Sequence, residues 1–476
     1  MTPQSAPHAG ERARALPEGL ALLGGLVLLA LGIILHAHSI GTAIRWIAIL
    51  LLAADATSRR KITPWIFVAM VAGTELGVDA PRVAVELNVF SAIFLRLIKT
   101  IVAPLILGTL VVGIAGHGDL KKVGWMGVRA LVYFEVVTTL ALCIGLAAIN
   151  ISKAGEGLGG KQTAAISAPA PVAVPAIVEP PKTRWDDVLL HMFPENLAKS
   201  IAENQLLQVT IFAVFFGVSL CLVGEEKRAP LLQLAESLSE VMFKFTNLVM
   251  YLAPVGVLGA MAFTVGHLGI GVLWNLGKLL LTLYVALIVF AVVVMLPAAL
   301  LFRVPVRRFL RYVAEPATLA FATATSEAAL PIAMEKMEAM GVPRRVVAFV
   351  IPAGYSFNLD GTTLYLAIAS VFVAQAAGIH MSWGEQLFMM GTLVLTSKGV
   401  GGVARASLVV LLATAATFHL PEWPIAVLLG FDTLLDMART AINVTGNCLA
   451  SVVVAKWQNE LGDERPSEAV LEGAEM

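Results

Sequence analysis

The chain has 476 residues, of which 58% are hydrophobic and only 14% charged, and its mean hydropathy is +0.83. Soluble domains are about half apolar and about a quarter charged, so this composition argues against a soluble globular protein and indicates an integral membrane protein. Lysine plus arginine and aspartate plus glutamate balance at 33 each, which excludes the general basic charge of a nucleic-acid-binding chain.

The predicted elements begin with two apolar runs, residues 18–36 and 41–56. Basic residues flank this pair on both sides, with Arg12 before it and Arg59 after it. Because basic residues concentrate on the cytoplasmic side of membrane proteins, the pair should cross twice and form a hydrophobic hairpin within residues 1–61. The first run lacks a small-residue cleavage site, so we expect it to be retained rather than cleaved as a signal peptide.

The same rule predicts six further crossings before the arginines that begin at Arg303. They are expected at residues 63–78, 88–115, 125–151, 195–222, 234–264 and 271–302. Lys121 and Arg228 mark two of the inside loops. Residues 152–185 are rich in proline, alanine and glycine and are too interrupted to span, so they are expected to form an extended external or disordered loop.

Two later apolar segments do not fit the alternation of inside and outside loops. Residues 312–335 have basic clusters on both flanks, whereas the loops on both flanks of residues 386–417 contain no lysine or arginine. Each piece should therefore enter and leave on one face, as a re-entrant hairpin, and the two hairpins have opposite sense. Full spans follow at 346–375 and 424–456, and such inverted units hold substrate where helices break. The alternative is that both pieces are ordinary spans, with one basic cluster outside.

The last span carries a regular series of polar side chains. They are Asp432, Asp436, Arg439, Asn443 and Asn447, at steps of four, three, four and four. At about 100° per residue they share one narrow stripe of a helix. Ionisable groups are too costly to face lipid and normally line an interior or a water-filled cavity. A substrate groove is the functional interpretation, and a structural seam of ion pairs between helices is the alternative.

The preceding span contains the polar sequence YSFNLDGTT in its middle. It includes Asn358, Asp360, Gly361 and Thr362. Glycine beside polar residues weakens a helix within the membrane and frees backbone carbonyls. An unwound turn with oxygen ligands suits a hard cation, whereas the structural alternative is a kink packed against a neighbour.

The tips of the two expected hairpins are small and polar. They read TATSEAALP at residues 323–331 and TSKGVGGVARAS at residues 396–407. Tight turns at membrane depth need such residues, and their backbone amides can bind an anionic group.

Glu135 is a lone carboxyl inside the apolar sequence YFEVVTTLA. A buried carboxyl readily holds a proton, which makes Glu135 a candidate proton carrier; a neutral, hydrogen-bonded glutamate is the alternative. Cys143, Cys221 and Cys448 form no CxxC pair, and the eight histidines form no metal spacing. We therefore expect no metal cluster and no disulfide framework.

These segments together resemble the dicarboxylate/amino acid:cation symporter family, the glutamate transporter fold. The resemblance lies in FLRLIKTIVAPLI (94–106), YFEVVTT (133–139), the tip before Leu330 and Pro331, NLDGTT (358–363), TSKG (396–399) and DMARTAINVTGN (436–447). It covers about residues 62–458, in the order of the family. The two N-terminal spans lie outside this pattern.

The resemblance implies an all-α integral membrane fold with eight core transmembrane helices, two re-entrant hairpins of inverted topology and the two extra N-terminal spans. Residues 62–305 would hold helices 1–6, mostly scaffold and trimer contacts, with helices 3 and 6 joining the transport domain. Residues 306–457 would form the transport core of hairpin 1, helix 7, hairpin 2 and helix 8, and residues 458–476 a cytoplasmic tail. The implied assembly is a homotrimer in a bacterial cytoplasmic (inner) membrane, with an elevator movement of the transport domain.

The resemblance also implies roles for single residues. Arg439 would pair with the side-chain carboxylate of the substrate and Asp436 with its amino group, and Asn443 would bind the main-chain carboxylate. The whole implied substrate-binding set is Arg439, Asp436, Asn443, Thr440, Thr362, Thr325, Ser326, Val400 and Gly402. The implied coupling set is Glu135, Gly354, Asn358, Asp360 and Asn447, with sodium possible at Asn358, Asp360 and Asn443.

The chain departs from the family pattern at three positions. Asn447 stands where sodium-coupled members typically have an aspartate, and Glu135 within YFEV resembles proton-coupled bacterial members, so protons are favoured over sodium. Ala404 and Arg405, in the tip that would act as a gate, replace a proline and a glycine. Because Arg405 adds bulk and charge over the expected gate, the identity of the substrate stays undecided at this point.

The sequence therefore predicts a symporter that imports glutamate or aspartate with protons, with no resident cofactor, enzyme activity or nucleic-acid partner. Asp436 together with Arg439 favours an amino acid with two carboxylates. The alternatives are a sodium-coupled carrier, a C4-dicarboxylate or neutral amino acid carrier of the same fold, and an uncoupled anion channel. A membrane enzyme would need a nucleophile–base pair or a metal cluster, and no such motif is visible.

Overall fold

The computed structural model describes residues 20–34, 39–59, 62–115, 120–158, 193–202, 206–396, 406–418 and 420–463. Every regular element within these ranges is a helix. Six helical stretches in them are long and apolar enough to cross a membrane, or seven if one bent pair is counted as a single span. The all-helical membrane class predicted from composition is therefore confirmed for the described part of the chain.

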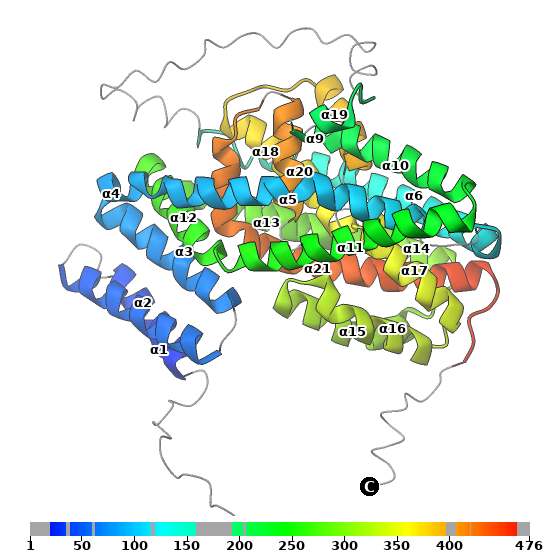
Figure 1. The fold of residues 1–476 in the computed structure, drawn as a ribbon. Helices are drawn as coiled ribbons and strands as arrows, with labels where there is room; N and C mark the ends of the chain where they lie inside the picture. Colours follow the sequence, from blue (N-terminus) through cyan, green and yellow to red (C-terminus); the bar gives the residue numbers. More distant parts are fainter. Residues whose placement is uncertain are drawn as a thin grey trace, which may run out of the picture.

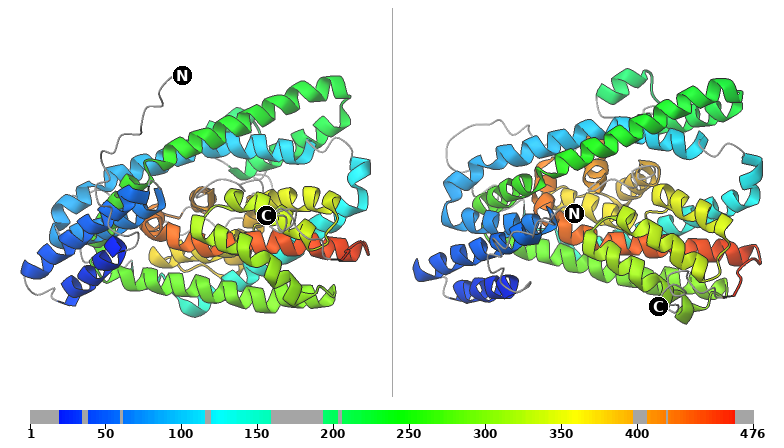
Figure 2. Two further views of the ribbon diagram at one scale, coloured as in Figure 1. Left: turned by 90° about the horizontal axis from the view of Figure 1, so that it is seen from below. Right: turned by 60° about the horizontal axis from the view of Figure 1, so that its bottom comes forward.

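The N-terminal hairpin lies at one edge of the molecule (Figures 1 and 2). It consists of α1 (Leu20–Ile34) and α2 (Ser39–Arg59), which pack against each other, and α2 also packs on α3 (Ile62–Asp79). Leu26 of α1 and Leu50 of α2 are exposed. Apolar side chains turned away from the protein are expected of a hairpin that faces lipid.

A first group of helices continues from α3. It contains α4 (Pro81–Glu86), α5 (Asn88–Ala115), α9 (Leu197–Ala202), α10 (Leu206–Leu222), α11 (Glu225–Met250) and α12 (Ala253–Leu268). α12 packs on both α3 and α5, and α5 also packs on α10 and α11. At Gly73 of α3 an added Cβ would lie 2.5 Å from the carbonyl oxygen of Leu258 in α12. Small residues at such crossings let helix backbones approach closely within a membrane.

The crossing expected at residues 234–264 is two helices instead of one. α11 and α12 meet at an angle of 53°. Pro254 follows the first residue of α12, and because proline has no N–H group it cannot continue the hydrogen-bond ladder of α11. The crossing expected at residues 195–222 is likewise described as α9 and α10, and residues 203–205 between them lie outside the described residues.

A second group of helices packs around the last one. It contains α6 (Leu120–Ser152), α13 (Val272–Phe290), the π-helical turn η1 (Ala291–Met295), α14 (Leu296–Leu301), α15 (Val306–Thr323), α16 (Ser326–Ala339), α17 (Arg344–Phe357), α18 (Asp360–Ala376), α19 (Trp383–Thr396), α20 (Ala406–Thr417) and α21 (Trp423–Trp457). α21 contacts α15, α16, α17 and α18, most of its residues are buried, and Figure 2 shows it running among the other helices of the group. A helix surrounded in this way can carry polar side chains that would be too costly against lipid.

Three of the places where helices of this second group end and begin concern the segments singled out in the sequence. α15 and α16 pack on each other and are joined by a tight turn in which Ala324 has a left-handed φ of 52°. α17 ends at Phe357 and α18 begins at Asp360, because Asn358 and Leu359 between them have non-helical ψ angles of 67° and 60°. The third is the interval between α19 and α20, and its residues 397–405 lie outside the described residues.

Candidate functional site

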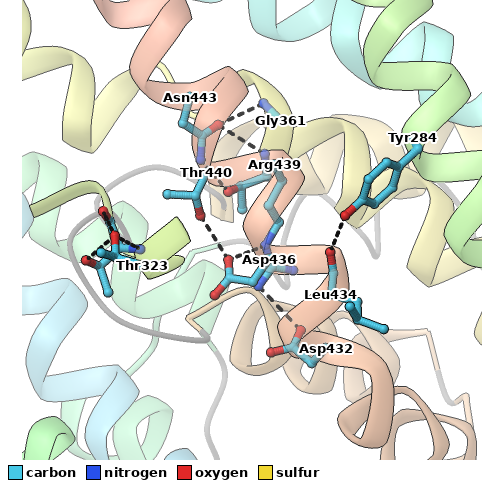
Figure 3. Close-up of polar contacts among 11 residues, drawn as sticks. Tyr284, Thr323, Gly361, Asp432, Leu434, Asp436, Arg439, Thr440 and Asn443 are labelled. Carbon is cyan, nitrogen blue, oxygen red and sulfur yellow. Dashed lines mark hydrogen bonds and ion pairs between the residues drawn. The ribbon is translucent and has the colours of Figure 1, made fainter. Parts of the chain in front are cut away.

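The polar stripe predicted on the last span faces the protein interior. Asp432, Arg439, Asn443 and Asn447 of α21 are each at most 3% exposed. Arg439 donates through Nε to Oδ1 of Asp436 at 2.7 Å and through Nη2 to Oδ1 of Asp432 at 3.4 Å (Figure 3). The guanidinium therefore lies between two carboxylates of its own helix, one turn and two turns before it.

The third nitrogen of the Arg439 guanidinium, Nη1, lies in a different environment from Nε and Nη2. Nη1 is buried and forms no hydrogen bond with any residue that the structure describes. The ring of Tyr365 lies 4.4 Å from Cζ of Arg439, so the aromatic face supports the cation. Buried guanidinium N–H groups normally have a hydrogen-bond partner. Nη1 is therefore a donor available to a carboxylate that enters the site.

Asp436 is the more accessible of the two carboxylates. Thirteen per cent of its side chain is exposed, whereas Asp432 is fully buried. Thr440 donates its hydroxyl to Oδ1 of Asp436 at 3.2 Å. Two carboxylates around one guanidinium leave a net negative charge, so a ligand ammonium group would be stabilised beside Asp436.

Asn443 joins α21 to the start of α18. Its Oδ1 accepts hydrogen bonds from the backbone N–H groups of Gly361 at 2.8 Å and Thr362 at 3.2 Å, and its Nδ2 donates to the hydroxyl of Thr362 at 2.8 Å. The first N–H groups of a helix lack partners within it, and α18 has no capping side chain of its own. Asn443 supplies this cap and keeps one Nδ2 hydrogen for a ligand.

The break between α17 and α18 gathers buried oxygen atoms. Asn358 donates through Nδ2 to Oδ2 of Asp360 and to Oδ1 of Asn447, both at 3.1 Å. Asn358 and Asp360 are fully buried, and Oδ1 of Asn358 accepts no hydrogen bond from the described residues. An unsatisfied buried oxygen beside a carboxylate fits a hard cation. Groups of three His, Cys, Asp or Glu side chains for a metal ion are absent from the described part of the chain.

Two glycines allow the elements around this cluster to approach. At Gly354 an added Cβ would lie 2.3 Å from Oδ1 of Asn447, and at Gly446 it would lie 2.3 Å from Oδ2 of Asp360. A larger residue at either position would displace one of the oxygens. Gly354, which the family resemblance assigned to the coupling set, thus lies beside Asn447.

The first hairpin tip lies on the side of α21 that carries Asp436 and Thr440, as seen at Thr323 in Figure 3. Thr325 donates its hydroxyl to Oγ1 of Thr323 at 3.3 Å. The hydroxyl of Tyr355 in α17 donates to the carbonyl oxygen of Ser326 at 2.9 Å and so links the tip to the helix break. The residues expected from the second tip, Val400, Gly402, Ala404 and Arg405, lie outside the described residues.

The burial considered for Glu135 is not found, because its side chain is exposed on α6. Tyr133, two residues earlier, is 6% exposed on a helix that packs against α17 and α18. Residues two apart on a helix point about 200° apart, so α6 can turn only one of them toward the break. That residue is Tyr133.

Tyr133, Tyr355 and Tyr365 are site residues that the sequence analysis missed. A tyrosine within an apolar span resembles an ordinary packing residue. Spacing gave no signal for Tyr365, because it follows Asp360 by five residues and so points about 140° away from it around the helix. Its contact with Arg439 on another helix could not be read from that spacing.

The comparison with known proteins assigns most of the chain to one family. The model of the sodium:dicarboxylate symporter family matches residues 62–457. A proton/sodium-glutamate symport protein of Geobacillus stearothermophilus is 38% identical over 410 residues, 86% of this chain and 97% of that protein. A proton/glutamate-aspartate symporter of Escherichia coli is 42% identical over 368 residues, 77% of this chain and 84% of that protein. A C4-dicarboxylate transport protein of Solibacter usitatus is 42% identical over 407 residues, 85% of this chain and 94% of that protein.

The family match includes the polar stripe, the helix break and the two small, polar segments at residues 323–331 and 396–407, and it leaves out the N-terminal hairpin. The family expected from the sequence motifs is confirmed. The long apolar helices agree with that assignment. The chain therefore belongs to the sodium:dicarboxylate symporter family and is a multi-pass membrane symporter, in a family of transporters and not of enzymes.

Proposed function

We propose that this symporter imports glutamate or aspartate across a bacterial cytoplasmic membrane. The observation that carries the proposal is the buried Nη1 of Arg439, which has no partner among the described residues. Nε of the same guanidinium pairs with the partly exposed Asp436. A carboxylate of the substrate would satisfy Nη1, and its ammonium group would face Asp436. Relatives that are named for glutamate transport support an acidic amino acid as the substrate.

A C4-dicarboxylate is the second candidate substrate. A relative with 42% identity is named a C4-dicarboxylate transport protein, and Arg439 would bind a carboxylate of either substrate. The difference lies at Asp436, because a dicarboxylate has no ammonium group to offset that negative charge. Asp436 therefore favours the amino acid.

The coupling ion is proposed to be the proton. Asn447 contributes a neutral amide to the cluster around Asn358 and Asp360, so the negative charge of this trio is that of Asp360, which a single proton can neutralise. Asp360, which is fully buried, is better placed to carry a proton than the exposed Glu135. A sodium ion bound among Asn358, Asp360 and Asn443 is the alternative.

Uptake of labelled glutamate into proteoliposomes tests substrate and coupling together. We expect an inward proton gradient without sodium to drive accumulation and a sodium gradient alone to drive none. Unlabelled aspartate should compete, whereas serine and succinate should not. Accumulation driven by sodium alone would show sodium coupling, and competition by succinate equal to that by aspartate would favour the dicarboxylate carrier.

The proposed architecture has eight core transmembrane helices, re-entrant hairpins α15–α16 and α19–α20, and an assembly of three chains. The first group of helices would be the scaffold, and the second group would be a transport domain that moves past it as an elevator. Supporting evidence is the ion pair between Lys99 of α5 and Glu422, which immediately precedes α21, at 2.7 Å. Lys99 lies about 16 Å along α5 from its first residue. The start of α21 therefore lies level with the middle of α5 and not with its start. If both helices begin on the outer side, α21 and the transport domain that contains it lie nearer the cytoplasm than the scaffold does.

This ion pair gives a modest expected effect on transport. Lys99 and Glu422 are 29% and 58% exposed, and exposed pairs contribute about 0.2–1 kcal/mol, or up to about fivefold in an equilibrium. Lys99→Gln should therefore change the uptake rate by up to about fivefold and leave the half-saturating glutamate concentration nearly unchanged. Initial rates in proteoliposomes measure both quantities.

Lys153→Gln is the matched control, because Lys153 pairs with Glu156 of the same segment at 3.1 Å. We expect it to leave the uptake rate unchanged. If Lys99→Gln weakened glutamate affinity strongly and left the maximal rate unaltered, the pair would not report on movement of the transport domain.

A further inference from the structure

The N-terminal hairpin lies outside the family match, yet a buried arginine pairs it with the rest of the protein. Arg45 of α2 is 6% exposed, and all three of its nitrogens have partners. Nε pairs with Glu75 of α3, Nη1 donates to the carbonyl oxygen of Gly32 in α1 at 3.2 Å, and Nη2 donates to the hydroxyl of Thr42 at 3.1 Å. Nη2 also lies 3.5 Å from Oδ1 of Asp79. Arg45 thus joins α1, α2 and α3.

The contact between α2 and α3 extends beyond the Arg45–Glu75 ion pair. Trp46 donates its indole N–H to Oδ2 of Asp79 at 2.9 Å. Toward the other end of α2, the side chains of Ile49, Leu52 and Ala56 form a buried apolar cluster with Val68 of α3. The contact between α2 and α3 therefore has a polar end and an apolar end, as specific helix interfaces in membranes do.

The two faces of α3 have different partners. Gly73 and Gly77 face α12, where an added Cβ would lie 2.5 Å from the carbonyl oxygen of Leu258 and 2.7 Å from Cβ of Val265, respectively. Glu75 lies between them in sequence and points about 200° away from each, toward α2. α3 is therefore held between the hairpin on one face and α12 on the other.

We propose that the N-terminal hairpin is a permanent part of the scaffold, docked on α3 by the Arg45–Glu75 pair, and that this docking holds α3 against α12. Removing Arg45 leaves the buried Glu75 without its counterion, and removing Glu75 leaves Arg45 only the longer pair with Asp79, whereas removing both leaves neither buried charge. Calling this part of the molecule a scaffold rests on the proposed elevator movement. The docking itself does not depend on that movement; it rests on the contacts between α2 and α3, and first on those of Arg45.

A double-mutant cycle on the full chain tests the docking. Arg45→Gln and Glu75→Gln should each lower the apparent melting temperature of the detergent-purified protein by about 5 °C or more. The double variant should recover at least half of that loss, and so should the charge swap of Arg45→Glu with Glu75→Arg. Lys153→Gln, which breaks an exposed pair, should change the melting temperature by about 1 °C or less.

The melting temperature of the whole chain is measured by the loss of its size-exclusion peak on heating. This measurement distinguishes a hairpin that stabilises the packing of α3 from a hairpin that is merely attached to it. If the single variants melted like the unmodified protein while trypsin cut newly near Arg59, the hairpin would be an appendage that supports nothing. Single and double variants with additive losses would contradict the ion pair. If the single variants yielded no folded protein, recovery by the charge swap would still support the pair, and failure of the swap would overturn it.

The two proposals fail separately. An unmodified chain that does not take up glutamate would refute the proposed substrate and leave the thermal coupling between positions 45 and 75 intact. If the changes in melting temperature at positions 45 and 75 were simply additive while glutamate uptake was normal, the docking alone would be refuted. Folded variants at Arg45 are expected to keep the half-saturating glutamate concentration of the unmodified protein, because the contacts of Arg45 do not include the polar stripe.

Discussion

Replacing Arg439 with alanine is expected to lower glutamate uptake by about a hundredfold or more. The substitution removes the donor proposed for the substrate carboxylate, and it leaves Asp432 and Asp436 without their shared guanidinium. Truncating one partner of a buried charged pair costs about 2–5 kcal/mol, and about 2.8 kcal/mol corresponds to a hundredfold change. Two uncompensated carboxylates would also repel an anionic substrate.

Initial uptake rates, normalised to the amount of folded protein, measure this effect. Arg129→Gln is the control, because Arg129 also contacts α21 but does so at its far end, where it donates to the carbonyl oxygen of Trp457 at 3.3 Å. We expect the control to transport within about threefold of the unmodified protein. Retention of normal uptake in Arg439→Ala would remove Arg439 from the substrate role.

The second large effect is expected at Asp360. Asp360→Asn keeps the size of the side chain and removes the buried negative charge beside Asn358 and Asn447. Without that charge the cluster can neither hold a cation nor release and take up a proton, so accumulation driven by an ion gradient should fall to background. The ion pairs of Arg439 do not involve Asp360, so glutamate binding should remain measurable while it loses its dependence on the coupling ion.

Binding measured at several pH values and sodium concentrations, together with gradient-driven uptake, checks this expectation. Asp55→Asn is the matched control. Asp55 is another buried aspartate, with 7% of its side chain exposed, but it pairs with Arg59 within the N-terminal hairpin. Gradient-driven accumulation by Asp360→Asn equal to that of the unmodified chain would exclude the cluster from coupling.

The polar stripe and the helix break could be predicted because each is a local property of the sequence. Helical periodicity alone places Asp432, Asp436 and Arg439 on one face, and burial of a charged face in a membrane protein follows from the cost of exposing it to lipid. The break at Asn358 follows from glycine and polar residues in an apolar span. All of these features are present in the structure.

The remaining features depend on contacts between segments that are distant in sequence. Asn443 caps a helix that begins about eighty positions earlier, and no pattern within either segment predicts that the two will pair. The orientation of α6, which buries Tyr133 and exposes Glu135, is set by the neighbours of the helix. The pairing of Arg45 with Glu75 is likewise visible only once α2 and α3 lie side by side.

Direct binding to the purified protein tests the central claim, that Arg439 receives the acidic side chain of an amino acid. In a calorimetric titration we predict that glutamate or aspartate saturates one site per chain. Serine, which has the same main-chain groups without the second carboxylate, should bind at least about a hundredfold more weakly. Serine binding as tight as that of aspartate, or no binding of either acidic amino acid, would contradict the assignment.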